Sequence, residues 1–122
     1  SDVYKRQKLS RAKYTAVFNG QPIVYNMEDI CFLESYDRKT SVVLGKKKIR
    51  VKARLDVEEQ RLSNYHFARI NQYTLINMLQ IRSMEGDEIR MANGEKLYIS
   101  SSRRKLFMEK YMQFAQENFS VV

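Results

Sequence analysis

Short runs of alternating apolar and polar residues, separated by turn residues, make up most of this chain. In the run 47–52, Ile49 and Val51 alternate with three cationic residues. A period of two is typical of a strand that buries one face and exposes the other. Six further short runs have strand-like patterns or compositions, at residues 14–18, 23–25, 41–44, 81–84, 88–92 and 96–99. The pattern therefore predicts a mainly β protein.

Glycine-containing turn signals lie between neighbouring runs. Asn19-Gly20 and Asn93-Gly94 each separate two predicted strands, and this dipeptide tolerates the positive φ angles of a type I′ hairpin turn. Gly45 lets the run 41–44 fold back onto 47–52. Because such short connections join antiparallel strands, the sequence predicts several small hairpins.

A short helix is predicted in the middle of the chain. Asp56 and Glu59 have the spacing of a capping box, with Asp56 as the N-cap and Glu59 at N3. Leu62 follows as an apolar anchor, so the helix is expected to last about two turns.

A longer helix is predicted near the C-terminus. Phe107, Tyr111 and Phe114 recur at intervals of four and three residues, with methionines beside them. This spacing predicts an amphipathic helix that begins near Ser102 and continues over 103–118. Its methionine and aromatic stripe is interpreted as a core face or a partner-docking face.

Length and composition narrow the class of protein. A chain of 122 residues is expected to fold as one domain with its own core. It has no run of about 18 apolar residues, so no segment is expected to span a membrane. A single cysteine, Cys31, cannot form an internal disulfide, which favours a cytoplasmic location. Residues 1–13 are interpreted as a linker, tag or cloning scar, and residues 14–118 as the domain.

The excess positive charge is concentrated in one segment. The chain has 22 lysines and arginines against 14 acids, for a formal net charge of +8. Eight of these cations lie within residues 38–54, which contain no acid, and outside it bases and acids balance. A charge run of this kind can be an ordinary solvated face. On paired strands it would instead form a positive surface that attracts polyanions.

No catalytic or metal site is predicted. His66 is the single histidine, and no nucleophile or acid stands at motif spacing from it. Cys31 alternates with apolar residues and is interpreted as a small buried side chain. The chain has no cluster of metal ligands, so we expect neither an enzyme nor a cofactor.

Three segments in order resemble the LytTR family of bacterial DNA-binding domains. Residues 67–77, F-A-R-I-N-Q-Y-T-L-I-N, resemble its F-x-R-I-H-x-S-x-x-V-N signature. Upstream, D-I-C-F-L-E-S at 29–35 resembles its D-I-x-Y-I-E-S strand. Downstream, N-G-E-K-L-Y-I-S at 93–100 resembles its N-G-x-x-L-P-V-S hairpin.

The resemblance implies both a fold and a function. The fold would be an elongated arrangement of about ten short strands in small antiparallel sheets, with one short mid-chain helix and a C-terminal helix. The function would be sequence-specific binding of double-stranded DNA through loops in successive major grooves, as a bacterial transcription regulator. An upstream receiver domain of a response regulator and a second copy on adjacent direct repeats are also implied.

The resemblance also implies three groups of contact residues. The first is the turn after Ser35, where Arg38 and Lys39 would hold phosphates or a guanine edge and Thr40 would face a base. The alternative is an ordinary charged turn. The second group lies near the minor groove, and the third follows Ile99. One further candidate, Lys47, lies in the basic strands. Together with the second and third groups, the remaining candidates are Lys47, Arg69, Asn71, Gln72, Ser100, Ser102, Arg103 and Lys105.

Departures from the family signature leave several roles open. Asn71 and Tyr73 replace the usual histidine and serine. Arg69 is equally consistent with a structural ion pair. The arginines after Ile99 come two residues late, so either Arg103 or Ser102 takes the place of the family's base-reading arginine. Ser102 as a helix N-cap is the alternative to a DNA contact.

Two other classes of protein suit parts of the sequence. An RNA-binding small β-barrel would suit the basic strands, but residues 38–54 contain no aromatic residue of the kind that stacks on bases. A protein-interaction module would suit the methionine-rich last helix. Neither alternative accounts for the three segments together.

Overall fold

The largest unit of the fold is a five-stranded antiparallel sheet. In the computed structural model of this protein, residues 12–119 are the described part of the chain. The strand order of the sheet is β5-β4-β3-β7-β6. Its members are β3 (Phe32–Tyr36), β4 (Lys39–Leu44), β5 (Lys47–Val51), β6 (Phe67–Asn71) and β7 (Thr74–Asn77).

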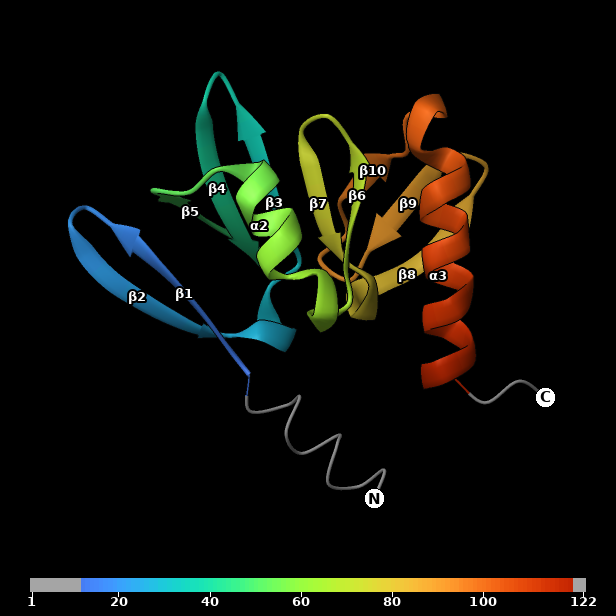
Figure 1. Cartoon of the computed structure of the whole chain (residues 1–122), viewed down its shortest axis with the longest axis horizontal. Helices are drawn as coiled ribbons and strands as arrows, with labels where there is room; N and C mark the ends of the chain where they lie inside the picture. Colours follow the sequence, from blue (N-terminus) through green and yellow to red (C-terminus); the bar gives the residue numbers. More distant parts are fainter. Residues whose placement is uncertain (1–11, 120–122) are drawn as a thin grey trace.

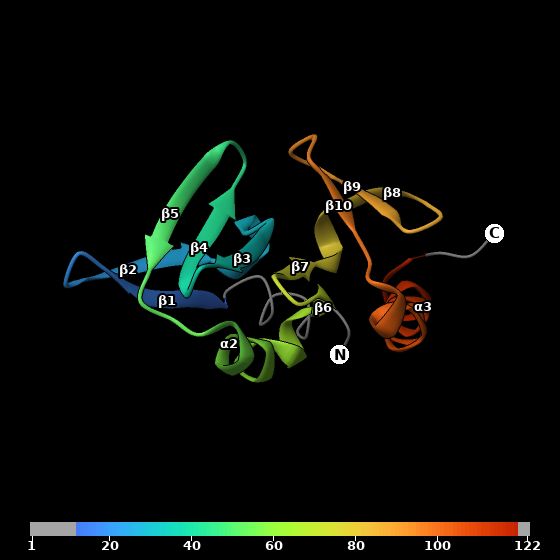
Figure 2. The same cartoon turned by 90° about the horizontal axis from the view of Figure 1, so that it is seen from above.

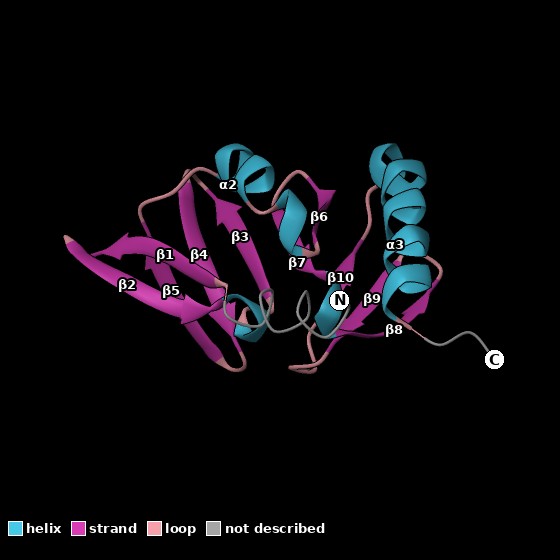
Figure 3. Cartoon of the chain, turned by 60° about the horizontal axis from the view of Figure 1, so that its bottom comes forward, coloured by secondary structure: helices cyan, strands magenta, loops and turns pink. Residues whose placement is uncertain are grey.

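Two smaller antiparallel sheets lie on either side of the large one (Figure 1). One is the hairpin of β1 (Lys13–Phe18) and β2 (Gln21–Asn26), and the other contains β8 (Ile81–Glu85), β9 (Glu88–Met91) and β10 (Lys96–Tyr98). Two α-helices, α2 (Leu55–Arg61) and α3 (Arg104–Asn118), complete the fold (Figure 3). The expectation of a mainly β chain with ten short strands in small sheets is confirmed.

The five-stranded sheet buries a core on each face. Phe32 and its cross-strand partners Val43 and Ile76 belong to the core beneath β8–β10 and α3. The next residue, Leu33, points to the opposite face, where it joins the core beneath the β1–β2 hairpin and α2. This alternation follows from the two-residue period of a strand. Strand β7, which lies between β3 and β6, is buried along its whole length because both of its faces are covered.

One of the two predicted Asn-Gly turns is confirmed. Asn19 and Gly20 both have positive φ, at 50° and 75°, and connect the directly paired residues Phe18 and Gln21. At Asn93-Gly94 the prediction of a two-residue turn was wrong. The first pair after that loop is Arg90 with Lys96, and positive φ occurs at Gly94 and not at Asn93. The Asn93 side chain instead donates to the Gly45 carbonyl at 2.9 Å, which ties the loop to the neighbouring hairpin.

The helices begin at different residues from those predicted. The capping box was wrong, because α2 begins at Leu55 with Arg54 as its N-cap, and no side chain caps it. Asp56 and Glu59 are instead drawn to Arg69. Helix α3 covers almost the predicted range and buries Phe107 and Phe114, so the core interpretation of its stripe is confirmed. Ser102 does not cap α3, since it lies in a 3-10 turn over Ser101–Arg103.

The folded part of the chain begins earlier than predicted. Lys13 belongs to β1, and the Ala12 carbonyl accepts a hydrogen bond from the Met27 N–H at 3.0 Å. The remaining residues interpreted as a linker or tag, 1–11, lie outside the described residues. In the part of the chain that the structure describes, no helix is long and apolar enough to cross a membrane.

Candidate functional site

Three segments that are distant in sequence meet along one edge of the molecule, the upper edge in Figure 1. They are the β3–β4 turn at 36–39, the β6–β7 turn at 71–74 and the segment 98–105 that leads into α3. We call them together the three-loop edge. The Ser35 N–H donates to the Tyr73 carbonyl at 2.8 Å, and the Asn71 side-chain amide donates to the Tyr98 carbonyl at 2.8 Å. These bonds hold the three segments in a defined relative position.

The β3–β4 turn presents two cations on a strained backbone. Asp37 and Arg38 have φ angles of 53° and 63° between the paired residues Tyr36 and Lys39. A left-handed conformation is unfavourable for arginine, and such strain often marks functional sites. Arg38 and Lys39 are exposed. Neither forms an ion pair with any residue of 12–119.

Thr40 is placed differently from its neighbours in this turn. Its side chain is buried, at 2% exposure, and its hydroxyl lies 3.4 Å from that of Ser35. Because Thr40 is paired with Val51 in the sheet, its side chain points toward the core beneath α2. The expectation that Thr40 faces a base does not fit this arrangement, since a base edge cannot reach a buried hydroxyl.

An aromatic pair that the sequence did not reveal joins the first two loops. The Tyr36 and Tyr73 rings stack with their centroids 5.0 Å apart and their planes 23° apart. Both rings are about half exposed, at 52% and 43%. The two residues are far apart in the chain, so the contact could not be found from local pattern. Stacking of this kind fixes the distance between the two turns.

Arg69 is the centre of a hydrogen-bond network beneath the edge. Its guanidinium contacts Asp56 at 3.1 Å and Glu59 at 2.8 Å, and it donates to the backbone carbonyls of Asn71 and Gln72. The side chain is 7% exposed. Arg69 could be a DNA contact or a structural ion-pair residue, and its contacts in the structure are those of a structural ion pair.

The β6–β7 turn offers one free polar side chain and one that is used locally. The Asn71 side-chain oxygen Oδ1 accepts from the Tyr73 N–H at 2.8 Å, while its side-chain NH2 group donates to the Tyr98 carbonyl in segment 98–105. Gln72 is exposed, and no hydrogen bond of its side chain occurs within the described residues. Asn71 therefore positions the turn, and Gln72 is the group available to a ligand.

The third segment contains both bound and free groups. Ser100 donates from its N–H to the Ile70 carbonyl at 2.9 Å, and its hydroxyl lies 3.3 Å from that of Ser102. Arg103 is 3.5 Å from Glu59, and Arg104 forms an ion pair with Asp87. Lys105 is exposed at the first turn of α3. Ser102 and Lys105 are thus more accessible than Arg103, which is held partly by α2.

Three of the eight cations in residues 38–54 lie at the other end of the β3–β4–β5 unit. We call this the distal end, formed by residues 45–48 and the neighbouring loop 92–95, at the upper side of Figure 2. Lys46 donates to the Asn93 carbonyl at 2.6 Å, and Lys48 forms an ion pair with Glu34. The hydrogen bond between Lys48 and Glu34 raises the pKa of Lys48. The Lys47 ammonium lies 6.0 Å from the centre of the Tyr25 ring.

A groove of about 680 Å³ separates the β3–β4 turn from the start of α2. Arg38 and Arg54 lie on its walls, with Gln72 and Tyr73 at its other side. Arg54 is exposed and free of ion pairs within residues 12–119. The sequence pattern places Arg54 in the basic segment but gives no sign of its position in the fold. The chain after β5 brings it beside the β3–β4 turn.

The remaining candidates for chemistry are buried or structural. Burial raises the pKa of the Cys31 thiol to about 11, so Cys31 is a poor nucleophile. Burial lowers the pKa of His66, whose ring packs against Phe114 with centroids 5.1 Å apart. Within residues 12–119 no three His, Cys, Asp or Glu side chains form a possible metal site.

Comparisons with known proteins agree with this geometry. The LytTR DNA-binding domain model matches residues 20–112. Among solved structures, the chain is similar to the LytTR DNA-binding domain of a Bacillus cereus protein named as a response regulator. The TM-score is 0.72 at 23% identity, and the match covers 82% of this chain and 96% of that one. No curated protein matches the chain significantly.

Proposed function

Because this chain belongs to the LytTR family of DNA-binding domains, we propose that it binds double-stranded DNA in a sequence-specific manner through the three-loop edge. The β3–β4 turn and segment 98–105 would enter successive major grooves, and the β6–β7 turn would lie over the minor groove between them. The major groove is where base pairs can be distinguished by their hydrogen-bonding edges.

The observation that carries this proposal is the placement of unpaired cations. Arg38, Lys39 and Arg54 are exposed on or beside one edge of the fold and have no ion-pair partner within residues 12–119. A duplex supplies phosphates at regular spacing, so it neutralises such cations and releases counterions. Lys46 and Lys48 of the same basic segment, by contrast, already have internal partners.

The residues divide into those that contact DNA and those that position the contacts. Arg38 and Gln72 are the best base-reading candidates, because arginine and glutamine can form bidentate hydrogen bonds to guanine and adenine. Lys39, Arg54, Ser102 and Lys105 are assigned to phosphates. Thr40, Arg69, Asn71 and Ser100 are assigned to positioning, since their polar groups have partners in the fold. Arg103 and Lys47 are assigned secondary electrostatic roles.

The biological setting follows from the family. We propose that this domain is the output half of a bacterial response regulator in the cytoplasm, with a receiver domain upstream. Family sites are commonly paired direct repeats, so two copies on adjacent sites are expected. The named Bacillus cereus relative supports this setting by analogy with its fold.

Selection of bound fragments from random duplex DNA, with single-stranded RNA as competitor, tests the proposal. We expect one enriched motif, and a slope of log K against log salt near −4 to −5 if about five phosphates are neutralised. Equal affinity for all duplexes, or an affinity independent of salt, would contradict it. Preferential binding of RNA would favour the alternative class, although the described strands form three open sheets and not a barrel.

A further inference from the structure

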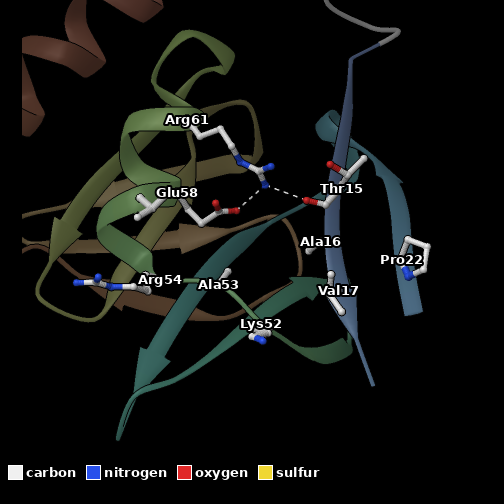
Figure 4. A pocket seen from close by; sticks show the side chains of 10 residues that line it. Thr15, Ala16, Val17, Pro22, Lys52, Ala53, Arg54, Glu58 and Arg61 are labelled. Atoms are coloured by element: carbon white, nitrogen blue, oxygen red, sulfur yellow. Dashed lines mark hydrogen bonds and ion pairs between the residues drawn. The ribbon is translucent and has the colours of Figure 1, made fainter. Parts of the chain in front are cut away.

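A second cleft of about 570 Å³ lies between the β1–β2 hairpin and α2 (Figure 4). The segment 52–54, which links β5 to α2, lines it opposite the hairpin. The cleft is hollow because the apolar side chains that line it are short. They are Ala16, Val17, Pro22, Ala53 and Val57. Val17 and Val57 are 39% and 52% exposed. The cleft thus has an apolar lining that no other described residue covers.

The backbone acceptors along this side of β1 already have partners. The Thr15 carbonyl accepts from Arg61 at 2.9 Å, and the Val17 carbonyl accepts from the Lys52 N–H at 2.9 Å. Glu58, the single acid that lines the cleft, is 4% exposed and accepts from Arg61 at 2.8 Å. Figure 4 shows Arg61 between the Thr15 carbonyl and the Glu58 carboxylate. A ligand therefore meets few free acceptors here.

Two backbone N–H groups and two cations of the cleft, in contrast, are free. In an antiparallel ladder the N–H and carbonyl of one residue point the same way. The N–H groups of Thr15 and Val17 therefore point away from β2, as their carbonyls do, and no backbone acceptor in residues 12–119 pairs with them. Lys52 and Arg54 add two exposed cations without ion pairs within those residues. The site matches a ligand with many acceptors and an apolar part.

We propose that this cleft docks an extended acidic segment of a partner polypeptide, in which carboxylates alternate with apolar side chains. Its backbone carbonyls would accept from the N–H groups of Thr15 and Val17, which is a partial form of strand addition because the carbonyls of these two residues already have partners. Its carboxylates would pair with Lys52 and Arg54, and its apolar side chains would fill the hollow beside Val57. Arg54 also lines the groove at the three-loop edge, so this surface adjoins the proposed DNA-binding edge and shares Arg54 with it.

Titration of the isotope-labelled chain with a blocked eight-residue peptide of alternating leucine and glutamate, followed by amide NMR, tests the proposal. We expect saturable shifts at residues 15–17 and 52–54 with a dissociation constant below about 1 mM. A peptide of leucine and glutamine is the matched control, and it should bind at least about fivefold more weakly because it lacks the charge. Equal binding of both peptides, or shifts elsewhere, would overturn the proposal.

Two exposed positions test the site without disturbing the fold. Val57→Glu places a like charge beside the bound carboxylates, and Lys52→Gln removes one cation, so each should weaken the acidic peptide by about fivefold. Lys46→Gln, at the distal end, is the control and should leave peptide binding unchanged. Thermal melts confirm that the variants are folded. Shifts at residues 15–17 caused by duplex DNA, and not by the peptide, would assign the cleft to the DNA interface instead.

Discussion

The three-loop edge and the distal end carry cations from the same basic segment, yet the fold uses them differently. At the distal end, Lys46 is bound to a carbonyl and Lys48 to a carboxylate. At the three-loop edge, Arg38 and Lys39 are exposed and have no ion-pair partner within residues 12–119. An internal partner already satisfies the charge, so DNA gains little by displacing it. Under the proposed function, the comparison teaches that cations without an internal partner, and not the density of cations in the sequence, indicate the DNA-binding edge.

The largest effect on stability is expected for Arg69, an arginine beneath the three-loop edge whose guanidinium is bound to acceptors within the fold. Arg69→Ala would leave two backbone carbonyls without their donor and remove the nearer of the two arginines that contact Glu59. We expect the free energy of unfolding to fall by about 3 kcal/mol, as measured by urea denaturation. Lys46→Ala should change it by less than about 0.5 kcal/mol. A fully stable Arg69→Ala protein that had lost DNA affinity would show instead that Arg69 contacts DNA.

The next largest effect is a difference in DNA affinity between substitutions at the three-loop edge and substitutions at the distal end. Arg38→Ala should cost about 1–3 kcal/mol of binding free energy and relax the preference at one position of the site. Lys47→Ala and Lys48→Ala should weaken all sequences alike and by much less. Fluorescence anisotropy with the selected site and a scrambled site measures both quantities. The comparison fails if the lysine changes alter the preferred sequence while the arginine change does not.

The strained turn allows stability and affinity to be separated at one residue. Arg38→Gly removes the same guanidinium but relieves a left-handed backbone at φ 63°. The free energy of unfolding should rise by about 1 kcal/mol, while DNA affinity falls as in Arg38→Ala. Denaturation and anisotropy on the same samples check this. A loss of stability in the glycine variant would mean that the arginine side chain supports the turn.

A smaller effect is expected at Thr40, whose hydroxyl is buried beneath the turn. Thr40→Val should leave the preferred DNA sequence unchanged and lower stability by no more than about 1 kcal/mol, because its bond to Ser35 is long. Repeating the selection from random duplex DNA tests this directly. An altered motif would show that the turn opens on DNA and exposes Thr40.

The smallest effect concerns pH and lies away from both ends. Burial lowers the pKa of His66 in the folded state below its ordinary value of 6.5, with Glu117 opposing and Lys110 reinforcing the shift. Between those two values the unfolded state binds more protons, so stability should decrease as the pH falls below 6.5. His66→Asn, which tolerates the local φ of 70°, should flatten the unfolding free energy in this range. An unchanged pH dependence in that variant would assign the effect to other groups.

Much of the fold and the class of function could be predicted from the sequence because local pattern carries both. The alternation in 47–52 appears as β5, the Asn19-Gly20 pair as a type I′ turn and the aromatic spacing of 107–114 as α3. The three LytTR-like segments identified the family, which the match over residues 20–112 confirmed. In each case neighbouring residues determine the structure, through strand period, turn conformation or helix period.

The tertiary structure alone decided which residues are free to act. Thr40 is buried because the register of β4 turns it toward the core, and Asp56 and Glu59 bind Arg69 instead of capping α2. The stack of Tyr36 on Tyr73 joins two turns that no local pattern connects. Each of these outcomes depends on a contact between residues far apart in the chain. The sequence by itself determined the elements and the net positive charge, whereas packing determined which charges have internal partners and which remain exposed.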